Sequence, residues 1–452
     1  MKSINPFNNK FIADYPEISI EEVTYAVELN YKAWKRWRLT TFEKRAALMR
    51  QSAMVLRNRK VELAELMTLE MGKRIAESEA EIEKSAWVCE YYAEHAQSML
   101  ADEPIVSDGQ KSMVVFQPIG PVLAVMPWNF PFWQVFRFLA PALMAGNTGL
   151  LKHASNVQGC AAAIEQVLLE AGFPKNVFRT LHIGASKVEA VIGNPKVKAV
   201  TITGSEDAGR IVAAQAGKHL KKVVLELGGS DPCIVLADAD LDEAAKVSVQ
   251  SRMLTAGQTC IAAKRLIVVE EVAELFLEKV KNELTNYKLG NPLDRSVLLG
   301  PLAKPNFVEE LHKQVSQSVK MGAKIEMGGE IMDRDSCFYP ATLLTNINRY
   351  MPVFREETFG PVIAFVIAKT EKEAIDLAND SSFGLGASLW TGNINRGEKL
   401  ARNIDAGAVF VNGMVKSDPR LPFGGTKNSG FGRELSHYGI KEFCNIKSVW
   451  IK

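Results

Sequence analysis

Short apolar runs alternate with helical stretches along most of the chain after residue 112, and this alternation restricts the fold more than any other feature. The runs span residues 113–116, 121–126, 148–151, 199–202, 223–227, 233–236 and 266–269. Helical periodicity occupies intervening segments such as 159–171 and 208–220. Strands that alternate with helices predict βαβ units and a largely parallel sheet. The same pattern over residues 237–289 and 371–404 predicts a second α/β unit.

The segment from residue 19 to residue 99 is predicted to be helical. Thr40 and Glu43 have the spacing of a capping box, and apolar residues repeat at helical spacing behind them. Basic side chains between residues 32 and 60 alternate with apolar ones. That arrangement is typical of a solvated helix face rather than of a nucleic-acid-binding patch.

The charges of the 452 residues nearly cancel: 54 Lys and Arg against 52 Asp and Glu give a net charge of +2. This balance excludes the basic field of a nucleic-acid-binding protein. Six dispersed cysteines without a C-x-x-C pair argue against a disulfide scaffold and fit a reducing compartment. The amino terminus has no apolar signal core, and prolines and Arg137 interrupt the most apolar run, residues 118–151. We expect a soluble, cytoplasmic protein with no nucleic-acid or membrane partner and, because its histidines are scattered, no metal.

Three short motifs contain side chains suited to catalysis. Cys260 ends the motif GQTC and could be a nucleophile, although a lone cysteine is more often a small core residue. Glu226 lies in LELGG at the end of an apolar strand, where burial would raise its pKa toward that of a useful base unless the side chain reaches solvent. Asn129 lies in PWNFP and could either cap the following helix or donate its amide to a developing oxyanion. No single motif decides between these alternatives.

Taken together, the motifs resemble those of the aldehyde dehydrogenase superfamily. PWNFP, LELGG and GQTC occur in that order, and TGS at 203–205, EETFGP at 356–361 and PFGG at 422–425 add to the resemblance, which covers nearly the whole chain. The resemblance implies an α/β fold with a Rossmann-like cofactor-binding domain (1–100 and 119–228) and an α/β catalytic domain (229–430). A small β oligomerisation arm (101–118 and 431–452) would pair with residues 447–451 across subunits, which implies a homo-oligomer, either a dimer or a tetramer.

The resemblance also assigns roles to individual residues. Cys260 would be the nucleophile, Glu226 the general base and Asn129 the oxyanion donor. A thiolate would attack an aldehyde, a hydride would leave to the nicotinamide, and Glu226 would activate water to hydrolyse the thioester. The cofactor-binding residues implied are Trp128, Lys152, Ser155, Gly204, Ser205, Glu357 and Phe359.

Ser155 departs from the pattern of many NAD-preferring members of the family, which have a glutamate three residues after the lysine at position 152. A glutamate would repel a 2′-phosphate, whereas a serine beside Lys152 can donate a hydrogen bond to it. We therefore expect NADP to be accepted and preferred over NAD.

Arg137 indicates the type of substrate. It lies four residues after Trp133 on one helix face, and no Asp or Glu occurs between Asp108 and Glu165. A buried guanidinium needs a partner, which is either a carboxylate distant in sequence or an anionic substrate tail. Trp133, Arg137 and Ser417 match the substrate pocket of the branch of the family that oxidises succinic semialdehyde, and the resemblance implies that substrate.

The same residues are compatible with other substrates and functions. Another ω-carboxylated aldehyde, such as glutaric semialdehyde, would fit the same residues. A CoA- or phosphate-acylating enzyme is disfavoured by Glu226, and a non-catalytic cofactor-binding homologue by the intact set of Cys260, Glu226 and Asn129. Because Ala262 stands where some relatives have a second cysteine, no local disulfide switch is expected.

Overall fold

The computed structural model of the chain describes residues 1–332 and 336–452. A six-stranded sheet forms the first unit, and its strands are parallel except for β19. Its strand order is β19 (Gly430–Phe431), β9 (Lys222–Glu226), β8 (Ala199–Thr203), β5 (Pro121–Met126), β6 (Thr148–His153) and β7 (Phe178–Thr180). The central strands carry apolar side chains on both faces, so both faces need a cover of helices.

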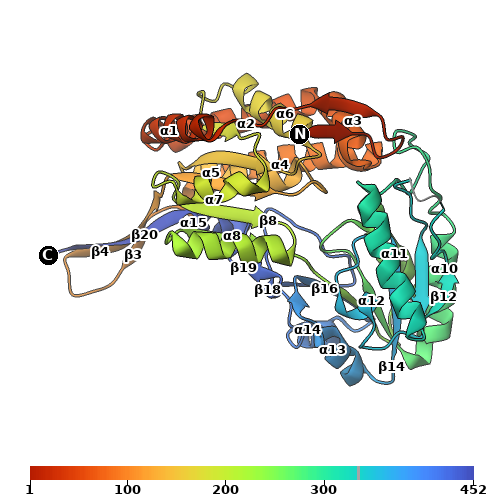
Figure 1. The fold of residues 1–452 in the computed structure, drawn as a ribbon. Coiled ribbons are helices and arrows are strands. Elements are labelled where there is room, and N and C mark those ends of the chain that lie inside the picture. The colour runs from red at the N-terminus through yellow and green to blue at the C-terminus, as the bar shows by residue number, and fades with distance from the viewer. Residues whose placement is uncertain (333–335) are drawn as a thin grey trace.

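Helices cover both faces of this sheet (Figure 1). One face packs against α2 (Phe42–Asn58), α3 (Lys60–Met71), α4 (Ile75–Met99), α5 (Trp133–Met144) and α6 (Gln158–Glu170). The other packs against α1 (Ile20–Trp37), α7 (Val188–Gly193) and α8 (Glu206–Lys218). The apolar run 118–151 therefore forms β5, α5 and β6 inside the protein. Within the described residues, no helix has the length and apolar character needed to cross a membrane.

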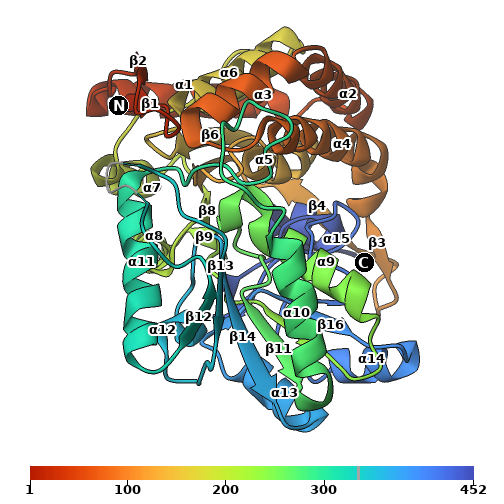
Figure 2. The same cartoon turned by 90° about the vertical axis from the view of Figure 1, so that its right-hand side faces the viewer.

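A seven-stranded sheet forms the second unit (Figure 2). Its order is β12 (Lys324–Met327), β13 (Thr342–Thr345), β14 (Val362–Ala368), β11 (Arg265–Val269), β10 (Pro232–Val235), β16 (Gly386–Trp390) and β17 (Ala408–Val411), with only β12 antiparallel among these. One face packs against α9 (Leu241–Met253), α10 (Ala273–Leu284) and α11 (Pro305–Lys320), and the other against α13 (Glu371–Asn379) and α14 (Ile394–Ala401). The prediction of a second α/β unit is confirmed.

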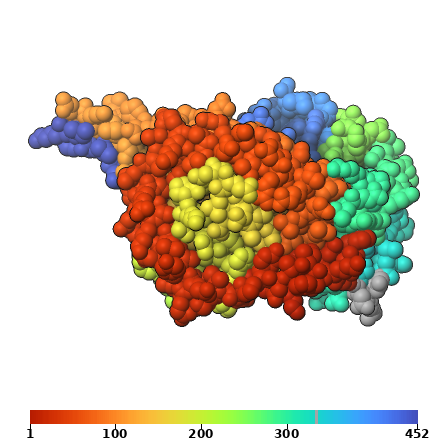
Figure 3. All heavy atoms as spheres, turned by 90° about the horizontal axis from the view of Figure 1, so that it is seen from above, coloured from red at the N-terminus to blue at the C-terminus, as the bar shows by residue number. Residues whose placement is uncertain are grey.

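A three-stranded antiparallel sheet, which we call the arm, projects from the body together with the carboxyl terminus (Figures 1 and 3). It consists of β3 (Glu103–Ile105), β4 (Lys111–Pro118) and β20 (Cys444–Ile451). Within one chain, residues 447–451 belong to β20, which pairs with β4 from Cys444 to Ile451 and is an edge strand of the arm. The backbone groups of β4 thus find their partners without a second chain. The pairing of residues 447–451 across subunits stays a prediction.

Smaller elements complete the fold. They are the hairpin β1 (Lys2–Ile4) and β2 (Phe11–Asp14), the pair β15 (Phe383–Gly384) and β18 (Thr426–Lys427), and the short helices α12 (Pro352–Arg355) and α15 (Ser436–Glu442). The helix after residue 40 begins one residue later than predicted, because Thr41 caps α2 by accepting from the Lys44 N–H at 3.3 Å. The Thr40 hydroxyl instead donates to the Trp37 carbonyl at 2.6 Å.

Candidate active site

Cys260 lies in the wall shared by two cavities. The first, of about 270 Å³, we call the Phe359 cavity, and its wall also includes Trp128, Asn129, Gly204, Ser205, Glu357 and Phe359. The second, of about 590 Å³, we call the Ser417 cavity, and its wall also includes Lys84, Phe130, Trp133, Arg137, Ser417 and Phe423. Most residues singled out in the sequence thus border one thiol from two sides.

The turn before Cys260 has a left-handed backbone. Thr255, Ala256 and Gly257 have φ values of 54°, 52° and 75°. A Cβ at position 257 would lie 2.3 Å from the carbonyl carbon and oxygen of Gly360, so only glycine fits there. Left-handed backbone at a non-glycine residue costs on the order of 1–3 kcal/mol, and such conformations gather at functional sites. The turn reverses the chain and places the cysteine between the cavities.

Arg252, at the end of α9, holds this turn in place. Its Nε donates to the Val362 carbonyl at 2.6 Å, its Nη1 to the Gly257 carbonyl at 3.1 Å and its Nη2 to the Thr358 carbonyl at 2.9 Å. The side chain is fully buried, and this burial lowers the pKa of Arg252 to about 9. Because carbonyl oxygens satisfy the guanidinium, the thiol-bearing turn is fixed against β14.

Asn129 is buried beside the same turn. Its Nδ2 donates to the Gln258 carbonyl at 2.9 Å, and its Oδ1 accepts from Gln134 Nε2 at 3.1 Å. The alternative that Asn129 caps the next helix is wrong, because α5 begins at Trp133, whose N–H donates to Glu81 Oε1 at 3.0 Å. Gln134 therefore fixes which end of the Asn129 amide faces the turn.

The thiol of Cys260 is only partly buried, whereas the other five free cysteines are buried. Desolvation raises the pKa of the Cys260 thiol to about 12, although the charges of Lys264 and Arg137 act in the opposite direction. In the free protein the thiol is therefore mostly protonated near neutral pH, and a nucleophilic thiolate is a minor species.

Glu226, at the end of β9, is 2% exposed, so the alternative that its carboxylate reaches solvent is wrong. Burial raises the pKa of Glu226 well above its usual range, and the nearby Glu434 raises it further, while Arg137 opposes the shift. Within the described residues, neither carboxylate oxygen of Glu226 has a hydrogen-bond partner. The side chain thus has the character of a proton-accepting base held away from water.

Arg137 does have a carboxylate partner: it forms an ion pair with Glu434, and both side chains are buried. Its Nη2 also donates to Thr203 Oγ1 at 3.2 Å, and its guanidinium lies 4.6 Å from the centre of the Phe423 ring. Of the two partners that the sequence left open, the structure shows the distant carboxylate. The local absence of acids around residue 137 was therefore not a sign of a missing counter-charge.

Trp133 and Ser417, both buried, meet in the Ser417 cavity together with Lys84. Ser417 Oγ accepts from Trp133 Nε1 at 3.0 Å and from Lys84 Nζ at 3.0 Å. The Lys84 ammonium lies 4.2 Å from the centre of the Trp133 ring. The structure therefore brings these two together with Arg137, the third pocket residue expected from the sequence, and adds a lysine that was not expected.

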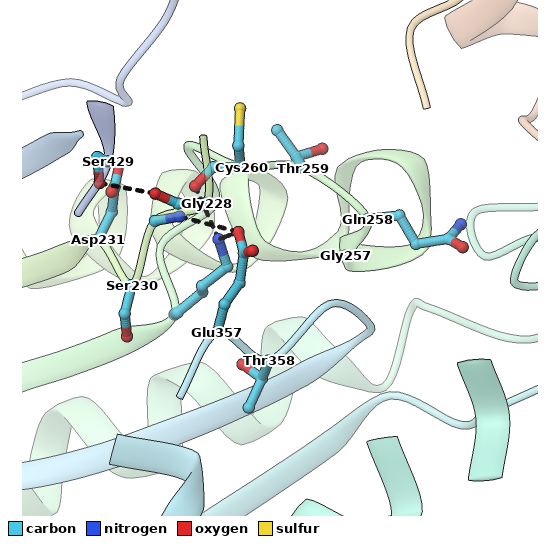
Figure 4. Close-up of polar contacts among 12 residues, drawn as sticks. Gly228, Ser230, Asp231, Gly257, Gln258, Thr259, Cys260, Glu357, Thr358 and Ser429 are labelled. Carbon is cyan, nitrogen blue, oxygen red and sulfur yellow. Dashed lines mark hydrogen bonds and ion pairs between the residues drawn. The ribbon is translucent and has the colours of Figure 1, made fainter. Parts of the chain in front are cut away.

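Hydrogen bonds hold the Glu357 carboxylate in the wall of the Phe359 cavity (Figure 4). Its Oε1 accepts from Lys264 Nζ at 3.0 Å and from the Gly229 N–H at 3.0 Å, and Lys264 also donates to the Cys260 carbonyl at 2.7 Å. A Cβ at Gly228 would lie 2.5 Å from Glu357 Oε2, so a glycine there allows the carboxylate to approach. Figure 4 shows the Cys260 sulfur pointing away from Glu357 and these contacts.

The strand–turn–helix unit predicted around Gly204 is present. Ser205 caps α8 by accepting from the Ala208 N–H at 3.3 Å. Because Gly204 and Ser205 belong to the wall of the Phe359 cavity, the amino end of this helix lies at that cavity. Lys152 is the last residue but one of β6 and is partly buried, and Ser155 is exposed in the turn that follows the strand. Burial lowers the pKa of Lys152, and the positive charge of Lys304 lowers it further.

The sequence analysis missed Gln134, Lys84 and Lys264 as well as Arg252 and Glu434, all of which contribute to the site. Gln134 could have been found as the one uncharged polar side chain in the otherwise apolar α5. Lys84 and Lys264 had no sequence signal, because their neighbours along the chain do not show which cavity they border. Within the described residues, no three His, Cys, Asp or Glu side chains are grouped as a metal site requires.

A sequence model of the aldehyde dehydrogenase family matches residues 1–449. The "Probable succinate-semialdehyde dehydrogenase" for NADP(+) of Synechocystis sp. is 49% identical over 449 residues, which cover 99% of each chain. The succinate semialdehyde dehydrogenase for NAD(P)+ named Sad of Escherichia coli is 45% identical over 448 residues, covering 99% of this chain and 97% of that one. The structure of succinic semialdehyde dehydrogenase from Streptococcus pyogenes in complex with NADP+ matches with a TM-score of 0.97 and 36% identity, covering 100% of this chain and 99% of that chain.

The raised pKa of Cys260 predicts how its alkylation depends on pH. Because the thiolate is a minor species below about pH 12, its fraction should rise about tenfold for each unit of pH between roughly pH 7 and pH 9. The rate of carbamidomethylation of the free protein by iodoacetamide, followed by peptide mass spectrometry, measures this fraction. Cys260→Ala gives the background from the buried cysteines. A rate that levels off by about pH 8 would contradict a pKa raised by burial.

Proposed function

The chain belongs to the aldehyde dehydrogenase family, and from that premise we propose that it oxidises succinic semialdehyde to succinate with NADP or NAD. The observation that carries this proposal is the position of Cys260 between the Phe359 cavity and the Ser417 cavity. A nucleophile in a wall shared by two cavities can hold an aldehyde carbon between a bound cofactor and a bound substrate tail. Full-length relatives at 45–49% identity that are named for succinic semialdehyde support the choice of substrate.

The first half of the reaction uses Cys260 and Asn129. The thiolate adds to the aldehyde carbon, which forms a C–S bond and an alkoxide, the thiohemiacetal. The Asn129 Nδ2 and the Cys260 backbone N–H would donate to that oxygen, and Gln134 keeps the Asn129 amide in the orientation this requires. The nicotinamide, when bound, accepts the hydride that leaves the same carbon. Loss of the hydride converts the thiohemiacetal into a thioester on Cys260.

Glu226 acts in the second half, hydrolysis of the thioester. Its raised pKa suits a base that takes a proton from water, and within the described residues its carboxylate oxygens have no hydrogen-bond partner that would compete with that water. The hydroxide equivalent adds to the thioester carbon, and the C–S bond breaks to give succinate and the Cys260 thiolate. Aldehyde, water and oxidised cofactor thus yield the carboxylate, reduced cofactor and two protons.

The Phe359 cavity fits a dinucleotide on three counts. The open amino end of α8 at Ser205 presents backbone N–H groups to an anion such as a pyrophosphate. Glu357 is positioned by Lys264 to accept from ribose hydroxyls, and Trp128 lies edge-on to Phe359 with centroids 5.8 Å apart, which gives an aromatic wall. We assign cofactor binding to the six-stranded unit and catalysis to the seven-stranded unit.

Lys152, Ser155 and Lys304 support a preference for NADP. Burial lowers the pKa of both lysines, and the charge of Lys304 lowers that of Lys152 further, so a phosphate dianion beside them would favour their charged forms. The exposed Ser155 hydroxyl in the turn after β6 can donate to the same phosphate. No carboxylate lies at position 155 to repel it.

Ser155→Glu tests this preference. The new carboxylate should lower kcat/KM for NADP by roughly tenfold to a hundredfold through repulsion of the 2′-phosphate, and leave kcat/KM for NAD within about twofold. The rate of cofactor reduction at saturating aldehyde provides the measurement, and Ser98→Glu, an exposed serine on α4, is the matched control. A wild-type enzyme that strongly prefers NAD, or a variant that loses both cofactors equally, would contradict the assignment.

A small panel of aldehydes tests the proposed substrate. Butanal has the chain length of succinic semialdehyde but lacks the carboxylate, and its kcat/KM should be lower by roughly tenfold to a hundredfold because it cannot make charge-assisted hydrogen bonds. Glutaric semialdehyde, one methylene longer, should fall between them. Cys260→Ala should form no reduced cofactor with any of the three. A higher kcat/KM for butanal or for glutaric semialdehyde would reject succinic semialdehyde as the substrate.

We also propose that the protein is a homo-oligomer formed through the arm. Ile446 and Trp450 lie on one face of β20 and are 60% and 52% exposed, and Val106 at the tip of the arm is fully exposed. An arm that extends from the body with apolar side chains uncovered is suited to pairing with a second copy of the chain (Figure 3). The six free thiols support the reducing, cytoplasmic compartment expected from the sequence.

The double variant Ile446→Asp and Trp450→Asp should shift the protein to a smaller species in sedimentation velocity, because two buried charges would replace apolar contacts at the interface. Leu39→Asp is the control, since Leu39 is 80% exposed on the body of the protein. A wild-type monomer, or a double variant with the wild-type sedimentation coefficient, would argue against assembly through the arm.

A further inference from the structure

Nearly all the charged side chains of the Ser417 cavity are already paired. Arg74 forms an ion pair with Glu77, Arg420 with Asp418 and Arg137 with Glu434, and Glu81 is paired with Lys73. Two lysines of the cavity wall, Lys84 and Lys416, have no carboxylate within 4 Å among residues 1–332 and 336–452. Lys416 is exposed at the rim, whereas Lys84 projects from α4 and is partly buried.

The contacts of Lys84 are with neutral groups. Its Nζ donates to Ser417 Oγ at 3.0 Å and lies 4.2 Å from the centre of the Trp133 ring. A cation–π contact and one neutral acceptor orient an ammonium group but do not neutralise it. The ammonium has two more protons to donate, and the cavity that it borders also contains Cys260 in its wall.

Ser417 completes the arrangement. Its oxygen already accepts from two donors, Trp133 Nε1 at 3.0 Å and Lys84 Nζ at 3.0 Å. A hydroxyl has two lone pairs, so its own hydrogen is left to donate elsewhere. The Lys84 ammonium and the Ser417 hydroxyl thus each have a hydrogen left to donate, and two adjacent donors match the two oxygens of a carboxylate.

We propose that Lys84 is the residue that binds the substrate carboxylate, with Ser417 as the second donor and the apolar side chains of Phe130 and Phe423 around the methylene tail. The proposal rests on the proposed function, because it requires a substrate with a carboxylate tail. Arg137 borders the same cavity and has a carboxylate partner in Glu434, whereas Lys84 has none within 4 Å among the described residues.

The protonation state of Lys84 is consistent with this role and predicts that the preference for a carboxylate-bearing substrate depends on pH. Burial lowers the pKa of Lys84 to about 8, and the charges of Arg137 and Lys416 lower it while those of Glu81 and Asp418 raise it. The ammonium is therefore present below about pH 8 and is lost as the pH rises above that value. Binding of a carboxylate-bearing substrate should weaken over that range, whereas the binding of butanal should not change.

The test compares succinic semialdehyde with butanal in Lys84→Met, Lys84→Arg and Lys416→Met. Lys84→Met should lower kcat/KM for succinic semialdehyde by roughly tenfold to a hundredfold, mainly through KM, and leave butanal within about twofold. Lys84→Arg should restore most of the preference, and Lys416→Met, the same substitution at the exposed rim, should change neither aldehyde. Butanal oxidation by Lys84→Met shows that the variant is folded and that Cys260 is active.

The ratio of kcat/KM for the two aldehydes cancels the ionisation of Cys260, which both reactions share. In the wild-type enzyme this ratio should fall above about pH 8, and in Lys84→Met and Lys84→Arg it should not depend on pH. Equal loss on both aldehydes, or an unchanged ratio in Lys84→Met, would overturn the role of Lys84 while leaving the proposed function intact. A wild-type enzyme without preference for succinic semialdehyde would overturn the proposed function and this inference with it.

Discussion

The ion pair between Arg137 and Glu434 is the interaction on which the electrostatics of the site depend. It joins α5 of the six-stranded unit to the segment that leads into α15. Its two charges act on the side chains of Cys260, Glu226 and Lys84. Arg137 lowers the pKa of Cys260 and of Lys84, while Glu434 raises the pKa of Glu226. Burial is the largest cause of each shift, and the pair modifies it: Arg137 favours the Cys260 thiolate and the neutral form of Lys84, while Glu434 favours the protonated form of Glu226.

The site exists only because segments distant in sequence meet at the turn before Cys260. Arg252 holds that turn to β14, Lys264 links the Cys260 carbonyl to Glu357, and Asn129 reaches it from the loop after β5. Each link uses a carbonyl acceptor, so the turn is fixed by polar contacts in a region where water is excluded. The thiol itself makes none of these contacts, which leaves the sulfur available to a substrate.

The sequence allowed the prediction of the two α/β units, because hydrophobic periodicity is a local signal, and the seven short apolar runs all became strands. Periodicity did not reveal that residues 113–116 belong to an antiparallel arm, which only the family resemblance implied, since pairing is a long-range property. The residues bordering the cavities could be predicted from motifs, but the partner of Arg137 could not. Glu434 lies far along the chain, and an absence of nearby acids says nothing about tertiary neighbours. Lys84 was missed for the same reason.

The central claim is that Cys260 carries the substrate as a thioester between the two cavities. Glu226→Gln should retain acylation and slow hydrolysis, so acid quenching of this variant with succinic semialdehyde and NADP should trap the intermediate. Peptide mass spectrometry would then locate it. The account predicts a succinyl group on the peptide that contains Cys260, in an amount equal to the NADPH formed in the first turnover. NADPH formation with Cys260 unmodified, or a succinyl group on another residue, would contradict it.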